Sequence, residues 1–340
     1  MEFFKTKKGS LITVILCIVI SAAVFGLILF TNKDRSQNGV FYSMDTIIET
    51  IGEDDVKDEV KDIFTRFESI FDMHSDKSEL SKLNSAGSMK VSAELSSALK
   101  RCGELCKEYG DDADITIGAV TKLWNITGKD PKVPSDDEIK KALETVGMKN
   151  ILINGDSVTL ENGAQIDMGC CAKGAALDEV KNRLDEKYKD QNDKKKTIVS
   201  AGSSSIMLYG DSKFETAVLS PDSDSERVGI LKTDAGFIST SGGYHRFTEI
   251  DGKKYIHIFD TKTGKPSDTD LTSVTVFCDS GIDSDMLSTM IFAGGTEKIG
   301  EYLKNDKIQI AAIDKDNNVY VSENAEFMIT DKDKYKIAEK

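Results

Sequence analysis

Asp285 and Thr289 have the spacing and the chemistry of a cation site. They lie four residues apart in a segment whose pattern predicts a helix beginning near Asp283 or Ser284, so their side-chain oxygens share one helix face. Oxygen donors near a helix N-terminus suit a hard divalent cation that carries phosphate groups, and Ser288 is assigned to the same site. The alternative is that these residues only cap the helix or face solvent.

His257 has the chemistry of a general base. Apolar alternation predicts a strand over Tyr255–Phe259, followed by a turn over Asp260–Gly264 and a second strand over Leu271–Phe277. An imidazole three residues before Asp260, at the end of a strand, could take a proton from a hydroxyl group. A packing role is the simpler interpretation of a single histidine. A base, a cation and a phosphate together indicate phosphoryl-transfer chemistry.

The surrounding elements alternate between helical and strand patterns, which predicts an α+β fold. Apolar residues at helical spacing predict helices over Asp54–Phe71 and Ser92–Tyr109, and Ser135 has the position of an N-cap. Trp124 is the single tryptophan, and we expect it to be buried. Strands are predicted over Phe41–Ile48, Ile151–Ile153, Ser157–Leu160, Ile308–Ile313 and Asn318–Val321.

The N-terminal residues have the pattern of a membrane anchor. Residues 11–30 contain no charged side chain and follow Lys5, Lys7 and Lys8, which predicts a transmembrane helix with residues 1–10 in the cytoplasm. A cleaved signal peptide is the alternative. We expect a linker over 31–40, with the folded body outside the cell as part of a single-pass membrane protein.

Charge and cysteine content exclude two classes of protein. The net charge is −14, and because the first 35 residues carry five basic and two acidic groups, the rest holds about −17. Such a body has no basic surface for nucleic acid. The five cysteines after the anchor are an odd number without regular spacing, so a disulfide scaffold is not expected. A zinc site at the vicinal Cys170 and Cys171 lacks a second pair of thiols at finger-like spacing.

Several motifs occur in an order that resembles one protein family. The chain contains STSGGYHRFTEIDGKKYIHIFDTKTGKP, then LTSVTV, then SDMLSTMIFAGG, with earlier matches at VPSDDEI and DMGCCAKGAALD. These segments are similar to the TSG-x-Y, H-x-x-D-x-x-T-G and D-x-x-x-T motifs of the ApbE family, the FAD:protein FMN transferases. The resemblance covers residues 41–330 and leaves a tail over 331–340. It implies a single catalytic body of the ApbE-type T-fold-like architecture.

The resemblance also implies a reaction and a set of site residues. Members transfer FMN from FAD, with Mg²⁺, to a Thr or Ser hydroxyl of an acceptor flavoprotein and release AMP. The metal ligands would be Asp285, Thr289, Ser288 and the carbonyl of Cys170. His257 would be the base, oriented by Asp260. The FAD contacts would be Met44, His74, Ala113, Asp114, Asp167, Lys173 and Phe259, with Lys173 on the phosphate.

Two departures from the family pattern leave alternatives open. Cys170 and Cys171 replace small and β-branched residues, and Gly202 is retained in a turn whose second glycine is lost. The competing hypotheses are therefore an FAD pyrophosphatase that gives FMN and AMP, and a flavin-binding protein without turnover. Acceptor segments of the family read D-x-x-[ST]-G-A-T, and the chain has no Gly-Ala-Thr or Gly-Ala-Ser, so modification of another protein is predicted.

Overall fold

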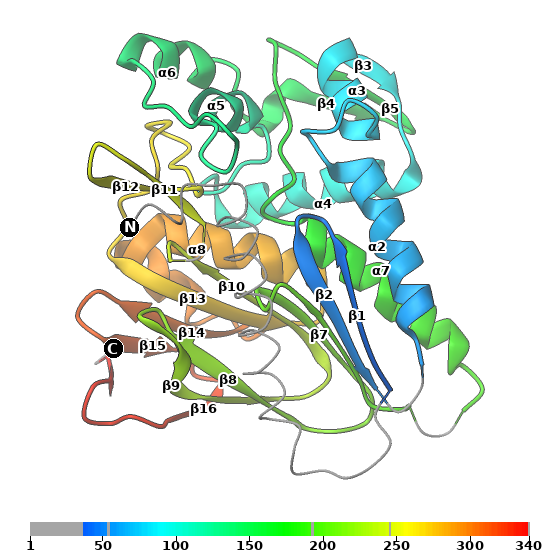
Figure 1. Cartoon of the computed structure of the whole chain (residues 1–340), viewed down its shortest axis with the longest axis vertical. Helices are drawn as coiled ribbons and strands as arrows, with labels where there is room; N and C mark the ends of the chain where they lie inside the picture. The colour runs from blue at the N-terminus through cyan, green and yellow to red at the C-terminus, as the bar shows by residue number, and fades with distance from the viewer. Residues whose placement is uncertain (1–36, 53–54, 192–193, 245, 339–340) are drawn as a thin grey trace, which may run out of the picture. The chain divides into compact units, whose positions relative to one another are not determined.

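A nine-stranded sheet forms the centre of the computed structural model, which describes residues 37–52, 55–191, 194–244 and 246–338 (Figure 1). Its neighbouring strands are antiparallel except for the last pair, which is parallel. In spatial order they are β1 (Gln37–Ser43), β2 (Thr46–Gly52), β6 (Thr197–Ala201), β7 (Ser205–Tyr209), β10 (Gly236–Gly242), β13 (Leu271–Cys278), β14 (Gln309–Asp314), β15 (Asn318–Val321) and β17 (Lys336–Ile337).

The central strands are buried on both faces because both faces are covered. On β14, Ile310 and Ala312 pack into the larger core, while Ala311 and Ile313 face the opposite core, as the two-residue period of a strand requires. Helices α2 (Lys57–Phe71), α7 (Ala172–Lys187) and α8 (Gly281–Tyr302) cover the first face. A three-stranded sheet of β8 (Phe214–Ser220), β9 (Ser223–Thr233) and β16 (Glu326–Ile329) covers the second.

Smaller elements complete the body at one end of the helical layer (Figure 1). They are α3 (Glu79–Ala86), α4 (Ala93–Tyr109), α5 (Gly118–Trp124), α6 (Asp136–Leu143), the three-residue 3₁₀ helix η2 (Met148–Asn150), the sheet of β3 (Ser88–Lys90), β4 (Ile151–Asn154) and β5 (Ser157–Leu160), and the hairpin of β11 (Phe247–Ile250) and β12 (Lys253–Ile256). Trp124 is buried in a small separate cluster, as predicted, and its indole donates to the Gly264 carbonyl at 2.8 Å.

The N-termini of α7 and α8 meet backbone to backbone. A Cβ atom added at Gly174 would overlap the carbonyl oxygen of Gly281, and one added at Gly281 would overlap that of Gly174. Only glycine at both positions allows this approach. It places the first turn of α8 beside the first turn of α7, and so determines where the side chains of both turns point.

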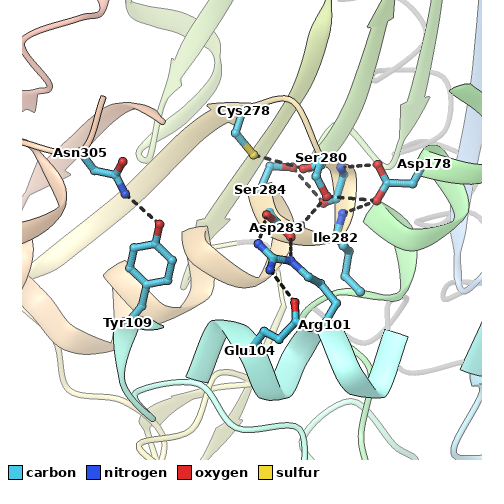
Figure 2. Close-up of polar contacts among 11 residues, drawn as sticks. Arg101, Glu104, Tyr109, Asp178, Cys278, Ser280, Ile282, Asp283, Ser284 and Asn305 are labelled. Atoms are coloured by element: carbon cyan, nitrogen blue, oxygen red, sulfur yellow. Dashed lines mark hydrogen bonds and ion pairs between the residues drawn. The ribbon is translucent and has the colours of Figure 1, made fainter. Parts of the chain in front are cut away.

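Asp178 of α7 holds the start of α8 in place (Figure 2). Its carboxylate accepts hydrogen bonds from the amides of Gly281 at 2.7 Å and Ile282 at 2.9 Å, and from the Ser280 hydroxyl at 3.3 Å. These amides are among those that a helix cannot satisfy internally, and a carboxylate there also favours the helix dipole. Arg101 of α4 adds two bonds to Asp283, at 2.8 and 2.7 Å. Two neighbouring helices therefore position α8.

Most predicted elements are confirmed. The helices over Asp54–Phe71 and Ser92–Tyr109 are α2 and α4, and Ser135 caps α6 in a capping box with Glu138. The predicted strands that the structure confirms are β4, β5, β13, β14 and β15. Among the described residues no helix is both long enough and apolar enough to cross a membrane; the predicted anchor over 11–30 and residues 1–10 lie outside them.

Three predicted boundaries are wrong. The strand over Phe41–Ile48 is two strands, because Met44 and Asp45 form a tight turn with φ of 51° and 54°; β1 also takes up residues 37–40 of the predicted linker. The strand over Tyr255–Phe259 ends at Ile256. Helix α8 begins at Gly281 with Ser280 as N-cap, earlier than predicted, because Asp178 satisfies its first amides from another helix.

Candidate active site

Asp285 is the centre of a buried group of oxygen atoms. It lies in the second turn of α8 with 5% of its surface exposed. One carboxylate oxygen accepts from the Ser205 hydroxyl at 2.5 Å and the other from the Gly174 amide at 2.8 Å. Because Gly174 and Ser205 belong to α7 and β7, three separate elements fix this carboxylate.

Hydroxyl groups extend the oxygen group along α8. Ser288 and Thr289 donate to the Asp285 carbonyl at 2.9 and 3.3 Å, and Ser241 of β10 contacts both hydroxyls, at 2.8 and 3.1 Å. The predicted trio of Asp285, Ser288 and Thr289 is therefore brought together by the structure. The partners Ser205 and Ser241 were not assigned from the sequence, although Ser241 lies in the TSG motif and could have been found there.

The segment that leads into α7 carries three further predicted site residues. Asp167 accepts from the Thr121 hydroxyl and the Gly169 amide, both at 2.8 Å, which fixes its side chain. Cys170 is half-buried in the following turn, and Lys173 lies in the first turn of α7, directly before the glycine that binds Asp285.

His257 follows β12 and is held by one carbonyl group. Its Nδ1 lies 3.0 Å from the carbonyl oxygen of Arg246, the residue that precedes the partner strand β11. A carbonyl can only accept, so Nδ1 carries the proton and Nε2 holds the free lone pair. The pKa of His257 is lowered to about 4, mainly by burial and also by the charges of Arg246 and Lys173, while the hydrogen bond to the Arg246 carbonyl and the charge of Asp167 oppose the shift. The imidazole is therefore neutral at pH 7.

Asp260 shapes the turn after His257. Its carboxylate accepts from the amides of Lys262 at 2.7 Å and Thr263 at 3.2 Å, and the turn closes through the Gly264 amide. The Trp124 indole binds the same turn at the Gly264 carbonyl. In this structure the Arg246 carbonyl contacts the imidazole, and the predicted orienting role of Asp260 stays a prediction.

The turn between β1 and β2 is tied to the same region. Met44 donates its amide to Glu68 at 3.0 Å, and the Ser43 hydroxyl donates to the other oxygen of Glu68 at the same distance. The Arg246 guanidinium donates to the Asp45 carbonyl at 3.3 Å. Arg246 therefore connects the turn that presents Met44 with the strand end that presents His257. Neither Glu68 nor Arg246 was assigned from the sequence.

Three predicted flavin contacts have other partners in the structure, and a fourth is exposed. His74 is exposed, and Phe259, 7% exposed, packs against Trp124. Asp114 accepts from Thr116 through both the amide and the hydroxyl and from the Met148 amide, and burial raises its pKa. The Ala113 carbonyl accepts from the Cys106 thiol at 3.5 Å. Their contacts with flavin stay predictions.

The donor set fits magnesium better than zinc. Among the described residues no group of three or more His, Cys, Asp or Glu side chains could hold a metal ion. Asp285 is a single carboxylate among hydroxyl groups, each with remaining lone pairs. Mg²⁺ is commonly bound by one or two carboxylates together with substrate phosphates and water, whereas structural zinc needs several thiolates or imidazoles.

The sequence and the fold are both similar to those of known proteins. The model of the ApbE family matches residues 39–313. An FAD:protein FMN transferase of Treponema pallidum is 30% identical over 71% of this chain and 72% of its own, and one of Klebsiella pneumoniae is 25% identical over 78% and 84%.

Solved structures show that the likeness extends to the fold. The crystal structure of an ApbE protein from Thermotoga maritima has a TM-score of 0.78 at 25% identity, covering 85% of this chain and 97% of its own. The flavin transferase ApbE of Vibrio cholerae has a TM-score of 0.72 at 23% identity, with the same coverage. The mixed α/β fold is thus the one seen in these proteins, and the chain belongs to the ApbE family.

Proposed function

We propose that this chain is an FAD:protein FMN transferase that moves FMN from FAD to a Thr or Ser hydroxyl of another protein and releases AMP. The named relatives support a flavin transferase. The finer proposal rests on one observation: Nδ1 of His257 binds the Arg246 carbonyl and leaves Nε2 free, close enough to Lys173 and Asp167 for their charges to change the pKa of the ring. Gly174, the residue after Lys173, binds Asp285.

The proposed reaction uses Nε2 of His257 as the proton acceptor. The acceptor hydroxyl oxygen attacks the FMN phosphorus while its proton passes to Nε2, and the bond from phosphorus to the AMP oxygen breaks, with its electron pair leaving on AMP. The Arg246 carbonyl keeps Nδ1 protonated throughout, so that the imidazole always presents the same nitrogen. Lys173 stabilises the charge on the pyrophosphate.

Asp285, Ser288, Thr289 and the Cys170 carbonyl would hold Mg²⁺. When bound, the ion neutralises the charge that develops on the phosphate oxygens. Ser205, Ser241 and the Gly174 amide keep the carboxylate and the hydroxyl groups in place before any ligand arrives. Preorganised oxygen donors of this kind cost little rearrangement at the moment of reaction.

A mass-spectrometric assay tests the proposal. The chain is incubated with FAD, Mg²⁺ and a protein that carries a D-x-x-T-G-A-T segment, and transfer adds roughly 438 Da, FMN less water, to the acceptor. FMN and AMP in solution with an unmodified acceptor would favour the pyrophosphatase, and intact FAD would favour a binding protein.

Two variants of α8 sharpen the test. Asp285→Asn should reduce transfer by about a thousandfold, because the carboxylate among the groups that would hold Mg²⁺ is lost. Glu297→Gln is the matched control: this carboxylate lies on the same helix but is exposed, so transfer should stay within a few-fold of wild type. Equal losses in both variants would contradict the assignment of Asp285.

We further propose that the acceptor is an extracytoplasmic or membrane flavoprotein. The uncharged residues 11–30 after three lysines support an anchor with the body outside the cell. Protease treatment of intact cells tests the orientation: cleavage of the body from outside is expected, and full protection would contradict it.

A further inference from the structure

Four cysteines that the proposed function leaves without a thiol role lie in two neighbouring segments. Cys102 and Cys106 lie on α4, and Cys170 and Cys171 immediately precede α7. The thiols of Cys102 and Cys171 are fully buried, with their sulfur atoms 3.6 Å apart. The thiol of Cys170 also interacts with that of Cys171 and is half-buried, so it is the more accessible of the two.

The geometry selects one pair among the possible ones. Cys102 and Cys106 are one helical turn apart, where Cβ atoms are about 5–6 Å from each other, whereas a disulfide needs about 3.5–4.5 Å. The Cys106 thiol instead donates to the Ala113 carbonyl at 3.5 Å. Cys278, on β13, donates to the Ser280 carbonyl at 3.2 Å. Cys102 and Cys171 come from different elements and are already in van der Waals contact.

We propose that Cys102 and Cys171 form a disulfide that links α4 to the start of α7, with Cys170 as the thiol that first meets the oxidant. The oxidant is an external disulfide, either a small molecule or a dithiol oxidoreductase. The Cys170 thiolate attacks it, releases one thiol and forms a mixed disulfide. Cys171 displaces the second thiol from Cys170, and Cys102 then attacks Cys171 and frees Cys170. The net exchange converts two protein thiols and one external disulfide into one protein disulfide and two external thiols.

The link would act on the segment that builds the site. Cys171 is the N-cap residue of α7, and the helix continues through Lys173 to Gly174, which binds Asp285. The bond would close a loop between residues 69 positions apart. Closing such a loop restricts the unfolded chain, so the oxidised protein should melt about 5–8 °C higher than the reduced one. This inference does not depend on FMN transfer.

Peptide mapping tests the pairing directly. The full chain, with Cys17→Ser to remove the thiol outside the described residues, is treated with oxidised glutathione or with dithiothreitol, alkylated and digested. We expect a cross-linked peptide containing Cys102 and Cys171 only after oxidation. A vicinal Cys170–Cys171 bond as the final product, or thiols that all remain free to alkylation after unfolding, would overturn the proposal.

Cysteine variants test separately whether the Cys102–Cys171 disulfide forms and whether Cys170 takes part in its formation. Cys102→Ala and Cys171→Val should each abolish both the cross-link and the rise in melting temperature, while Cys278→Ala should keep both. Cys170→Ala should still form the cross-link, but at least tenfold more slowly; an unchanged rate would overturn the role of Cys170. Peptide mapping of the Cys17→Ser chain remains a valid test even if a variant folds poorly, because that chain keeps both Cys102 and Cys171.

Discussion

The protonation of His257 gives the sharpest test of the proposed reaction. The perturbation is a fall in pH from 7 to 5. An ordinary histidine with a pKa of about 6.5 would be only about 3% neutral at pH 5. Burial lowers the pKa of His257 to about 4, so the side chain should remain about nine-tenths neutral at pH 5. The fraction of competent base at that pH is therefore about thirtyfold larger than for an exposed histidine.

The folded protein favours the neutral form of His257, and this determines how activity and stability both change with pH. Activity that needs a neutral imidazole is present above pH 4 and is lost as the pH falls through 4. The unfolded chain binds this proton near pH 6.5, so the free energy of unfolding also decreases as the pH falls from 6.5 to 4. The shift corresponds to at most about 3 kcal/mol for this one group.

Two measurements check this prediction. The chain has three histidines, so His257→Gln identifies the His257 ring resonance in an NMR titration, whose midpoint should lie near pH 4. The acid limb of kcat/KM for AMP release should fall at the same pH. His257→Gln should lower kcat about 10²–10⁴-fold at pH 7, the usual contribution of a general base. A titration midpoint and an acid limb near 6.5 would refute the argument from burial.

Three further predictions concern the framework of the site. Gly174→Ala should lower the free energy of unfolding, measured in urea, by at least about 3 kcal/mol, because its Cβ would overlap the Gly281 carbonyl. The control is Gly300→Ala on the exposed end of α8, which should raise the free energy of unfolding by up to about 1 kcal/mol. Ser203→Gly should raise the melting temperature slightly, since Ser203 has a φ of 59°; a clear decrease would show that its hydroxyl matters more than its backbone. Burial raises the pKa of Asp178 to about 6, so its contribution to stability is present below pH 3.8 and decreases by at most about 3 kcal/mol as the pH rises to 6. Because His257 changes stability in the opposite direction over the same range, the quantity to measure is the difference in the free energy of unfolding between wild type and Asp178→Asn, which should fall by that amount from pH 4 to pH 6.5 in urea.

Elements with a strong local pattern could be predicted from the sequence. Helix α2 has a regular apolar face, and β13 has a run of β-branched residues, so local spacing alone determines their type. The predicted boundaries were wrong where a residue distant in the sequence determines the backbone conformation. The turn at Met44 has left-handed backbone without glycine, and it is supported by Glu68, 24 residues away. No local pattern could have shown that hydrogen bond.

In the site, too, residues within a local motif could be predicted, whereas their partners from distant parts of the sequence could not. Motif positions gave Asp285, Thr289 and His257, whose side chains could do the chemistry, because a motif records residue types at fixed spacing. The atoms that hold them come from elsewhere: the Ser205 hydroxyl lies 80 residues before Asp285, and the Arg246 carbonyl carries no side-chain signal at all.

The turn at Gly202 shows why a departure from a family motif must be judged on the backbone. The sequence lacks the expected second glycine, which is one reason to keep a pyrophosphatase or a flavin-binding protein as competing hypotheses. In the structure Gly202 and Ser203 both have left-handed backbone, with φ of 65° and 59°, and the turn still joins β6 to β7. Ser205 then enters β7 with its hydroxyl on Asp285. The departure therefore adds strain of the order of 1 kcal/mol at Ser203, and the strand after the turn still supplies a hydrogen bond to the Asp285 carboxylate.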